Sequence, residues 1–170
     1  MKTPGVIALT LLFSTLFAVA PLVATAGTTS KVPCFYYTEN NKIIGPTTGV
    51  CNANANDIAV VFTKTSTAKV ACTIQFSVAG KLVKPISPCP TKANDVEVYW
   101  TATTAGPVIS KCYWTLNGKA IAACTVPKGA TDFTFKAYKV TEVYWTVNGK
   151  ITGKPLKPPT GTNDVEFLFK

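Results

Sequence analysis

Acidic side chains are the first candidates for chemistry in this sequence, because it contains no histidine and so excludes any triad built on an imidazole. Two carboxylate pairs have one intervening residue, which places both members on one face of a β-strand: Asp95 with Glu97, and Asp164 with Glu166. Paired carboxylates perform acid–base chemistry in glycosidases. Because the spacing recurs along a repeated surface, we interpret these pairs as solvated polar positions and predict that the protein is not an enzyme.

Aspartate also recurs directly after asparagine, and the oxygens of both side chains suit calcium. The motif occurs as Asn56-Asp57, Asn94-Asp95 and Asn163-Asp164, with Thr131-Asp132 as a weaker copy. One carboxylate per copy is too few for an ion that takes about six or more oxygen ligands. We therefore predict that each motif is an Asx turn, in which the side chain accepts hydrogen bonds from local backbone N–H groups.

The six cysteines predict disulfides rather than reactive thiols or a zinc site. Zinc takes closely spaced Cys or His ligands, and the closest cysteines here are twelve residues apart, so we predict no metal and no cofactor. The predicted pairs are Cys34–Cys51, Cys72–Cys89 and Cys112–Cys124. The last copy of the repeat described below lacks both partners at once, as expected if cysteines pair within a copy.

Tyrosines next to inward-facing tryptophans are the candidate binding residues. Tyr99, Tyr113 and Tyr144 are predicted to point outward, and Tyr37 and Tyr138 are predicted to join them. Outward aromatic rings on a sheet stack on sugar rings or anchor another protein. The alternative is that these tyrosines cover a half-buried face between two lobes, or form cross-strand pairs.

Four copies of a strand–turn–strand pattern must position these side chains. The motif aspartates lie 38, 37 and 32 residues apart, which is typical of a repeat protein. Each copy has an aromatic or apolar strand followed by a turn with Asn or Gly before Lys, such as Asn117-Gly118-Lys119. Alternation with a period of two residues is sustained, without a helical period outside the N-terminal segment. The sequence predicts an all-β protein of antiparallel strands from four internal repeats of about 35 residues.

The alternation also assigns a face to each strand. The first strand of a copy is predicted to bury its cysteine face, as with Cys112, Trp114 and Leu116 in the third copy. A two-residue turn would place Cys112 opposite Ala123, so pairing with Cys124 needs a three-residue loop or one bulge. In the strands after the motif, the predicted inward residues are Ile58, Val60, Phe62, Val96, Val98, Trp100, Phe133, Phe135, Val165, Phe167 and Phe169.

A unit this small cannot bury one face of a sheet alone, so neighbouring copies must share a core. A disulfide-stapled, sandwich-like fold is the expected solution, either as one duplicated sandwich or as two small lobes. The chain then divides into repeats one and two, residues 27–103, and repeats three and four, residues 104–170.

Residues 1–26 have the features of a cleaved signal peptide: Lys2, an apolar run over residues 6–23, and a small-residue cleavage site at Ala24-Thr25-Ala26. They predict a secreted protein (extracellular, cell-surface or periplasmic) without a membrane span after cleavage. Seventeen lysines against eight acidic residues give a net charge of +9, or +8 without Lys2, which favours weak attraction to acidic polymers or anionic surfaces. The alternative is that the lysines serve solubility and protect strand edges from pairing. The absence of arginine argues against specific recognition of nucleic acid.

The last strand, residues 165–170, is apolar on both faces and is predicted to be an edge that pairs with another chain. Its candidates for self-association are Val165, Phe167, Leu168 and Phe169. We therefore expect a secreted, non-enzymatic protein with a structural or adhesive role at the cell surface or in an extracellular assembly or matrix. It would self-associate or bind another extracellular protein. The alternatives are a carbohydrate-binding module that uses the outward tyrosines, and an exported inhibitor of a hydrolase.

Overall fold

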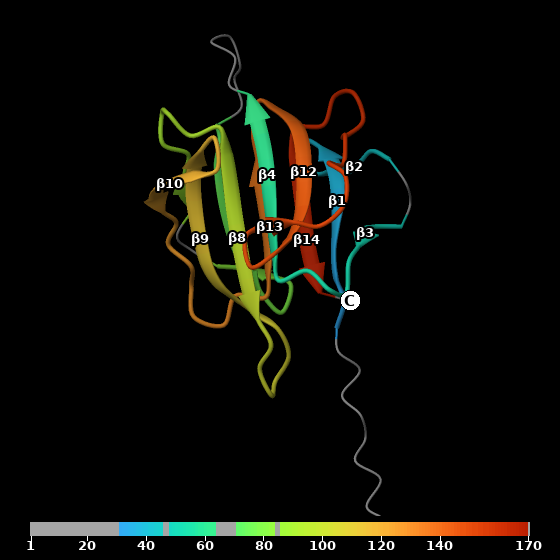
Figure 1. The fold of residues 1–170 in the computed structure, drawn as a ribbon, viewed down its shortest axis with the longest axis vertical. Helices are drawn as coiled ribbons and strands as arrows, with labels where there is room; N and C mark the ends of the chain where they lie inside the picture. The colour runs from blue at the N-terminus through green and yellow to red at the C-terminus, as the bar shows by residue number, and fades with distance from the viewer. Residues whose placement is uncertain (1–30, 46–47, 64–70, 84–85, 170) are drawn as a thin grey trace, which may run out of the picture.

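Two antiparallel β-sheets pack face to face in the computed structural model, which describes residues 31–45, 48–63, 71–83 and 86–169. The described part of the chain contains no helix. Figure 1 shows β9, β8, β4 and β12 side by side in the sheet nearer the viewer. The predicted all-β sandwich is confirmed, while the division into four repeats stays an interpretation of the sequence. The predicted signal peptide lies outside the described residues.

Sheet A has the strand order β2-β1-β14-β11-β5-β6, and β3 and β7 pair with the ends of β1 and β5. Its strands are β1 (Pro33–Glu39), β2 (Lys42–Ile43), β3 (Val50–Cys51), β5 (Thr73–Val78), β6 (Lys81–Leu82), β7 (Ser87–Pro88), β11 (Asp132–Lys136) and β14 (Asp164–Phe169). Sheet B has the order β10-β9-β8-β4-β12-β13. Its strands are β4 (Asp57–Thr63), β8 (Asp95–Thr101), β9 (Val108–Leu116), β10 (Lys119–Ala123), β12 (Lys139–Val147) and β13 (Lys150–Ile151).

One apolar core fills the space between the sheets, and period-two alternation places its side chains. The eleven inward positions predicted for the strands after the motif are all buried. Phe167 of β14 lies at the centre of the aromatic part, with its ring stacked on Phe133 at 4.9 Å between centroids and 5.0 Å from Trp100. Both sheets therefore contribute to a single core.

The predicted cysteine face is correct for two copies and wrong for the first. Cys72 and Cys112 are buried in the core, whereas Phe35 and Tyr37 occupy the core face of β1. Cys34 lies on the opposite face of β1, where it is buried beside β3. Two aromatic rings bury more apolar surface than a cysteine, which decides the face. Leu116, also predicted inward, is exposed beside the hairpin turn.

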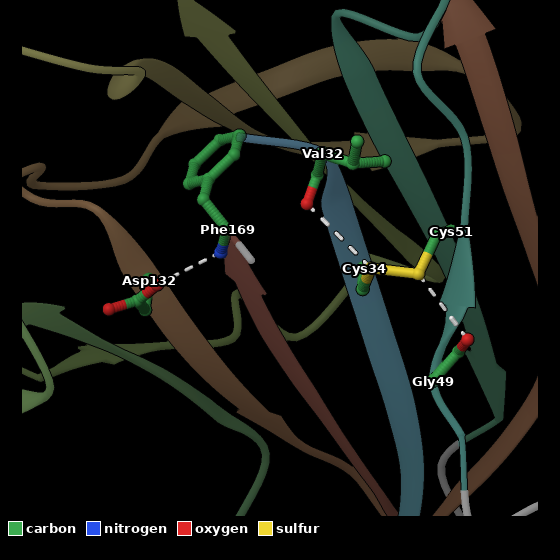
Figure 2. Close-up of a disulfide and its surroundings, with 6 residues drawn as sticks. All are labelled: Val32, Cys34, Gly49, Cys51, Asp132 and Phe169. Carbon is green, nitrogen blue, oxygen red and sulfur yellow. Dashed lines mark hydrogen bonds between the residues drawn. A yellow bond between two sulfur atoms is a disulfide. The ribbon is translucent and has the colours of Figure 1, made fainter. Parts of the chain in front are cut away.

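The three predicted disulfides are confirmed. Each joins a short return strand to the longer strand that it pairs with, through residues in these strands or next to them. The Cα–Cα distances are 4.1 Å for Cys34–Cys51, 5.3 Å for Cys72–Cys89 and 5.1 Å for Cys112–Cys124. Figure 2 shows the first, between β1 and β3. The third disulfide depends on the predicted bulge, which shifts the register of β10 between Ala120 and Ala122. As a result Cys124 lies next to Cys112, and the Cys124 N–H donates to the Cys112 carbonyl.

The prediction that the last strand is a free edge is wrong. β14 pairs with β1 on one side and β11 on the other. Val165, Phe167 and Phe169 are buried, and Leu168 is half-buried on the outer face. A strand with apolar side chains on both faces is typical of the interior of a sheet as well as of an interface between chains. Here β14 is an interior strand.

The two halves of the chain are interleaved rather than separate. Sheet A takes β1 and β5 from residues 27–103 and β11 and β14 from residues 104–170, and sheet B mixes the halves in the same way. The predicted boundary lies in the turn between β8 and β9, which pair along their length. Of the two arrangements that the sequence left open, the structure has the single sandwich.

Candidate binding groove

Tyrosine and glutamate side chains meet on the outer face of sheet B, which faces away from the core. Strand register places Tyr113 of β9 opposite Glu97 of β8, Glu97 opposite Ala59 of β4, and Ala59 opposite Tyr144 of β12. All four side chains are half-buried. We name these four residues the central row. Because Ala59 is small, the sheet is hollow between Glu97 and Tyr144.

Further acidic groups flank the central row. On one side lies a row with Asp95, Val61 and Glu142, and on the other lies a row with Asp57 and Tyr99. Alternation along each strand puts all of these side chains on the same outer face as the central row. Four of the eight acidic residues of the chain are thus on one face of one sheet.

The hollow is part of a groove of about 370 Å³. Its lining comprises Ala59, Val61, Asn94, Asp95, Glu97, Asn117, Gly118, Glu142, Tyr144, Thr146, Gly149 and Ile151. The β9–β10 and β12–β13 turns lie at opposite ends, because β9 and β12 run in opposite directions. Ligand pockets in proteins commonly span about 300–1,000 Å³, so the groove is large enough for a small ligand or for part of a polymer.

Two matched tyrosine–glutamate pairs stiffen this surface. The Tyr99 hydroxyl donates to Oε2 of Glu97 at 2.6 Å, and the Tyr144 hydroxyl donates to Oε2 of Glu142. Burial, then the Glu97 carboxylate, raises the pKa of Tyr99, and the bond to Glu142 raises the pKa of Tyr144. The phenols therefore stay protonated as donors, and each glutamate keeps a second oxygen for other partners.

The Asn-Asp motifs fix the turns that close the groove. Asn94 Nδ2 donates to Oδ1 of Asn117 at 2.7 Å, and the Asn117 backbone N–H donates to Oδ1 of Asn94 at 2.8 Å. Asp95 accepts a hydrogen bond from the backbone N–H of Gly118, the next turn residue. Asn117 and Gly118 both have positive φ, as a two-residue hairpin turn of this type requires. We name this set of contacts a turn latch.

Equivalent turn latches hold other hairpins in the described residues. Asn56 and Asn148 exchange hydrogen bonds of 2.7 and 2.8 Å, and Asn163 and Asn40 exchange bonds of 3.1 and 2.9 Å. In the weaker copy, the Thr131 hydroxyl accepts from the Ala79 backbone N–H at 3.0 Å. The prediction of local Asx turns is therefore wrong for these asparagines. Their Oδ1 atoms accept N–H groups of turns 23 to 123 residues away, which sheet pairing brings adjacent.

Burial beneath the latched turns changes the acidity of two aspartates. Burial, together with the nearby Glu97 carboxylate, raises the pKa of Asp95 to about 6, and hydrogen bonds from the Thr115 hydroxyl and the Gly118 N–H partly oppose this rise. The pKa of Asp57 is raised for the same reasons, with Thr146 and Gly149 in the equivalent positions. Oδ1 of each aspartate has no hydrogen-bond partner among the described residues.

The structure brings together three of the five tyrosines that the sequence singled out. Tyr99 and Tyr113 form an edge-to-face pair with 6.1 Å between ring centroids, and Tyr144 stands across the groove on β12. Tyr37 is a correction: it is only 6% exposed, packed edge-to-face on Phe35, and it cannot present its ring to a ligand. Tyr138 packs against the core in the connection between β11 and β12.

Sequence reasoning missed Glu142 and the role of Ala59. The repeated segment Glu-Val-Tyr-Trp at residues 97–100 and 142–145 carried the signal for Glu142, because one intervening residue puts Glu and Tyr on the same face of a strand. The position of Ala59 at the floor of the groove depends on the pairing of β4 with β8 and β12, which the sequence pattern does not contain. Of the predicted carboxylate pairs, Asp95 and Glu97 line the groove, whereas Asp164 and Glu166 lie on sheet A.

No cluster of three His, Cys, Asp or Glu side chains within the described residues has a geometry that could hold a metal ion. The same part of the chain has no helix that is long and apolar enough to cross a membrane. A scan against protein-family models found no match, and searches of curated proteins and of solved structures found no similar chain. The class of protein is therefore defined by its fold and groove: a disulfide-stapled β-sandwich with an acidic, tyrosine-lined outer face. Three disulfides indicate an oxidising, extracellular environment.

Proposed function

We propose that this chain is an exported carbohydrate-binding module whose site is the groove on sheet B. The observation that carries the proposal is the central row, in which Glu97 and Tyr144 flank a hollow floored by Ala59, and Tyr113 lies on the far side of Glu97. Aromatic rings offer a flat apolar face to the C–H face of a sugar, and carboxylates accept hydrogen bonds from its hydroxyls.

The framework of the groove suits a binding role. β4 and β8 are interior strands of the sheet, and the turns at both ends of the groove are held by turn latches. Side chains on such strands have little freedom to lose when a ligand binds, which favours affinity. The chain's disulfides and N-terminal segment support export, where extracellular polysaccharides are available as ligands.

A structural or adhesive role, our first expectation from the sequence, loses its main support because β14 is not an edge strand. The groove favours recognition of a ligand over self-assembly through the last strand. A hydrolase inhibitor would need an exposed loop shaped for an active site, and no specific feature of the described loops favours one.

The proposal is tested by replacing the tyrosines of the central row. We expect Tyr144→Ala to weaken binding to polysaccharides about tenfold or more, because a stacked aromatic ring contributes roughly 1 kcal/mol beyond the area it buries. Tyr113→Ala should weaken binding less, because Tyr113 lies beyond Glu97 and does not line the groove. Retention on a panel of insoluble polysaccharides and titration with soluble oligosaccharides measure the loss.

Thr134→Ala is the matched control, because Thr134 lies in the middle of the outer face of sheet A, between Gln75 and Glu166. It should leave retention unchanged, and thermal unfolding of all variants checks that they fold. Failure of the unmodified protein to bind any member of a broad glycan panel would contradict the proposal.

A further inference from the structure

The charge of the groove is opposite to that of the whole chain. Lysines outnumber acidic residues by seventeen to eight, yet Asp95, Glu97 and Glu142 line the groove and no lysine is among its described lining residues. Asp95 and Glu97 lie on the same face of β8 with one residue between them, and repulsion between their like charges is unfavourable unless a partner compensates it. The arrangement therefore favours a ligand that brings positive charge.

Asp95 provides a second and independent indication. It is only 7% exposed, it lines the groove beside the Asn117–Gly118 turn, and its Oδ1 lacks a hydrogen-bond partner among the described residues. Because this oxygen has almost no accessible surface, a ligand in the groove compensates the Asp95 charge through its electric field rather than by a hydrogen bond to Oδ1. An ammonium group carries that compensating charge, whereas a neutral hydroxyl does not.

The spacing of the carboxylates excludes a single metal ion as the compensating charge. Asp95 and Glu97 are on β8 and Glu142 is on β12, with β4 between them, so the strands are roughly 10 Å apart. Ligands of one calcium ion lie about 2.3–2.6 Å from it, and no suitable cluster is present among the described residues. Charges at this separation suit ammonium groups on different units of one organic ligand.

The backbone of the groove favours a saccharide over a peptide as that ligand. β4 is paired with β8 and β12, and β8 is paired with β4 and β9, so the floor offers no free strand edge. An extended peptide bound here could not add to the sheet through main-chain hydrogen bonds. A saccharide needs none, because it is recognised through ring stacking and through side-chain contacts with its polar groups.

Building on the carbohydrate-binding function proposed above, we propose that the groove selects amino sugars with free ammonium groups over neutral or acidic sugars. Glu97 and Glu142 bind ammonium groups on opposite sides of the hollow, and Tyr144 stacks on a ring between them. Asp95 adds negative charge at the end closed by the β9–β10 turn. The selectivity of the site thus comes from its carboxylates, and its shape comes from tyrosine and Ala59.

The experiment compares three oligosaccharide series of equal length by calorimetric titration of the full protein at pH 6 and low salt. They are β-1,4-linked oligomers of glucosamine, N-acetylglucosamine and glucose. We expect the glucosamine oligomer to bind about tenfold or more tightly than the other two, and added salt to reduce this advantage. Glu97→Gln and Glu142→Gln should each remove most of the preference, measured as the ratio of the two affinities, because the amide keeps the size of the side chain but not its charge.

Glu166→Gln, on the outer face of sheet A, is the matched control and should keep the full preference. Equal affinity for the charged and neutral oligomers would overturn the amino-sugar inference and leave the carbohydrate site intact. The absence of binding to all three series would overturn both proposals. Tighter binding of a lysine oligomer than of the glucosamine oligomer, abolished by Glu97→Gln, would also overturn the inference, in favour of a protein ligand.

Discussion

At the scale of single residues, the outer face of sheet B combines groups that a stability-optimised surface would keep apart. Asp95 and Asp57 are buried beneath the latched turns, each with one unpartnered oxygen, and Glu97 lies near both. Burying a carboxylate without full hydrogen bonding opposes folding. Unfavourable local electrostatics of this kind cluster at functional sites, which is consistent with the proposed groove.

The raised pKa of Asp95 makes stability depend on pH in a defined direction. Because this pKa is about 6 in the folded protein and lower in the unfolded chain, the folded state binds more protons between about pH 4 and 6. The contribution of Asp95 to stability is therefore fully present below this window and is lost as pH rises through it. Relative to the wild type, we expect Asp95→Asn to gain about 2 kcal/mol in unfolding free energy between pH 4 and pH 7.

Urea unfolding of both proteins at several pH values measures this difference. Asp132→Asn is the comparison variant, since Asp132 follows Thr131 in the weaker motif and is half-buried on sheet A. Parallel stability curves for wild type and Asp95→Asn across this pH range would contradict the assignment of the raised pKa to Asp95.

The sequence was sufficient to predict the outward tyrosines of sheet B but not the fate of Tyr37. Period-two alternation placed Tyr99, Tyr113 and Tyr144 correctly, because each neighbours a large inward side chain. In β1, Phe35 is followed by two adjacent tyrosines, so the sequence pattern does not show which face of the strand is inward. Packing of Phe35 against Trp145, with 5.2 Å between the ring centroids, decides it. Local pattern cannot resolve such a choice, because it depends on distant residues.

At the scale of elements, the hairpin and the Asn-Asp strand act as one unit although they come from different copies. The hairpin at Asn40 is held by Asn163, and the hairpin at Asn148 is held by Asn56. The weaker motif at Thr131 holds the hairpin at Ala79, which itself lacks an asparagine. The one motif without asparagine therefore contacts the one hairpin without asparagine. This match indicates that the motif and the hairpin turn depend on each other through the turn latch.

The turn latch predicts a specific coupling between Asn94 and Asn117. Asn94→Ala removes two hydrogen bonds, of 2.7 and 2.8 Å, and leaves the Asn117 N–H without its acceptor, so we expect a loss of about 1–2 kcal/mol. Asn117→Gly removes only the side chain and keeps the positive φ that the turn needs. A double-mutant cycle by urea unfolding measures the coupling, which should be about 0.5–1 kcal/mol.

The exposed Asn54 supplies the control, since Asn54→Ala removes an amide of the same type away from any turn latch. Its effect on unfolding should be within about 0.5 kcal/mol. Additive effects of Asn94→Ala and Asn117→Gly would show that the amide-to-amide contact contributes nothing beyond the separate side chains.

At the scale of the whole molecule, the strand class and disulfide pairs followed from local pattern, whereas the order of strands did not. Cysteine spacing and the hairpin turn at Asn117-Gly118 act within one copy, so the sequence contains them directly. The pairing of β14 with β1 joins segments more than a hundred residues apart. An apolar strand looks alike as an edge and as an interior strand, and only the complete sheet distinguishes them.

Interleaving of the two halves predicts that the sandwich unfolds as one cooperative unit. Each sheet needs strands from residues 27–103 and from residues 104–170, and one core connects Trp100 of the first half with Trp145 and Phe167 of the second. Either half alone would expose the core face of its strands. We therefore expect each fragment to be unfolded in isolation, and the two to regain β-structure when mixed under oxidising conditions.

Circular dichroism measures the β-structure of each fragment, and tryptophan fluorescence measures burial of the core in each half. The three tryptophans are divided between the halves: Trp100 is in the first, and Trp114 and Trp145 are in the second. For the intact protein, the two signals should change in a single coincident transition. Cleavage of the exposed turn between β8 and β9 provides the control, since it should leave both fragments associated through the shared sheets. Two separate transitions, or a folded fragment of residues 27–103, would instead indicate that the core is divided into independent halves.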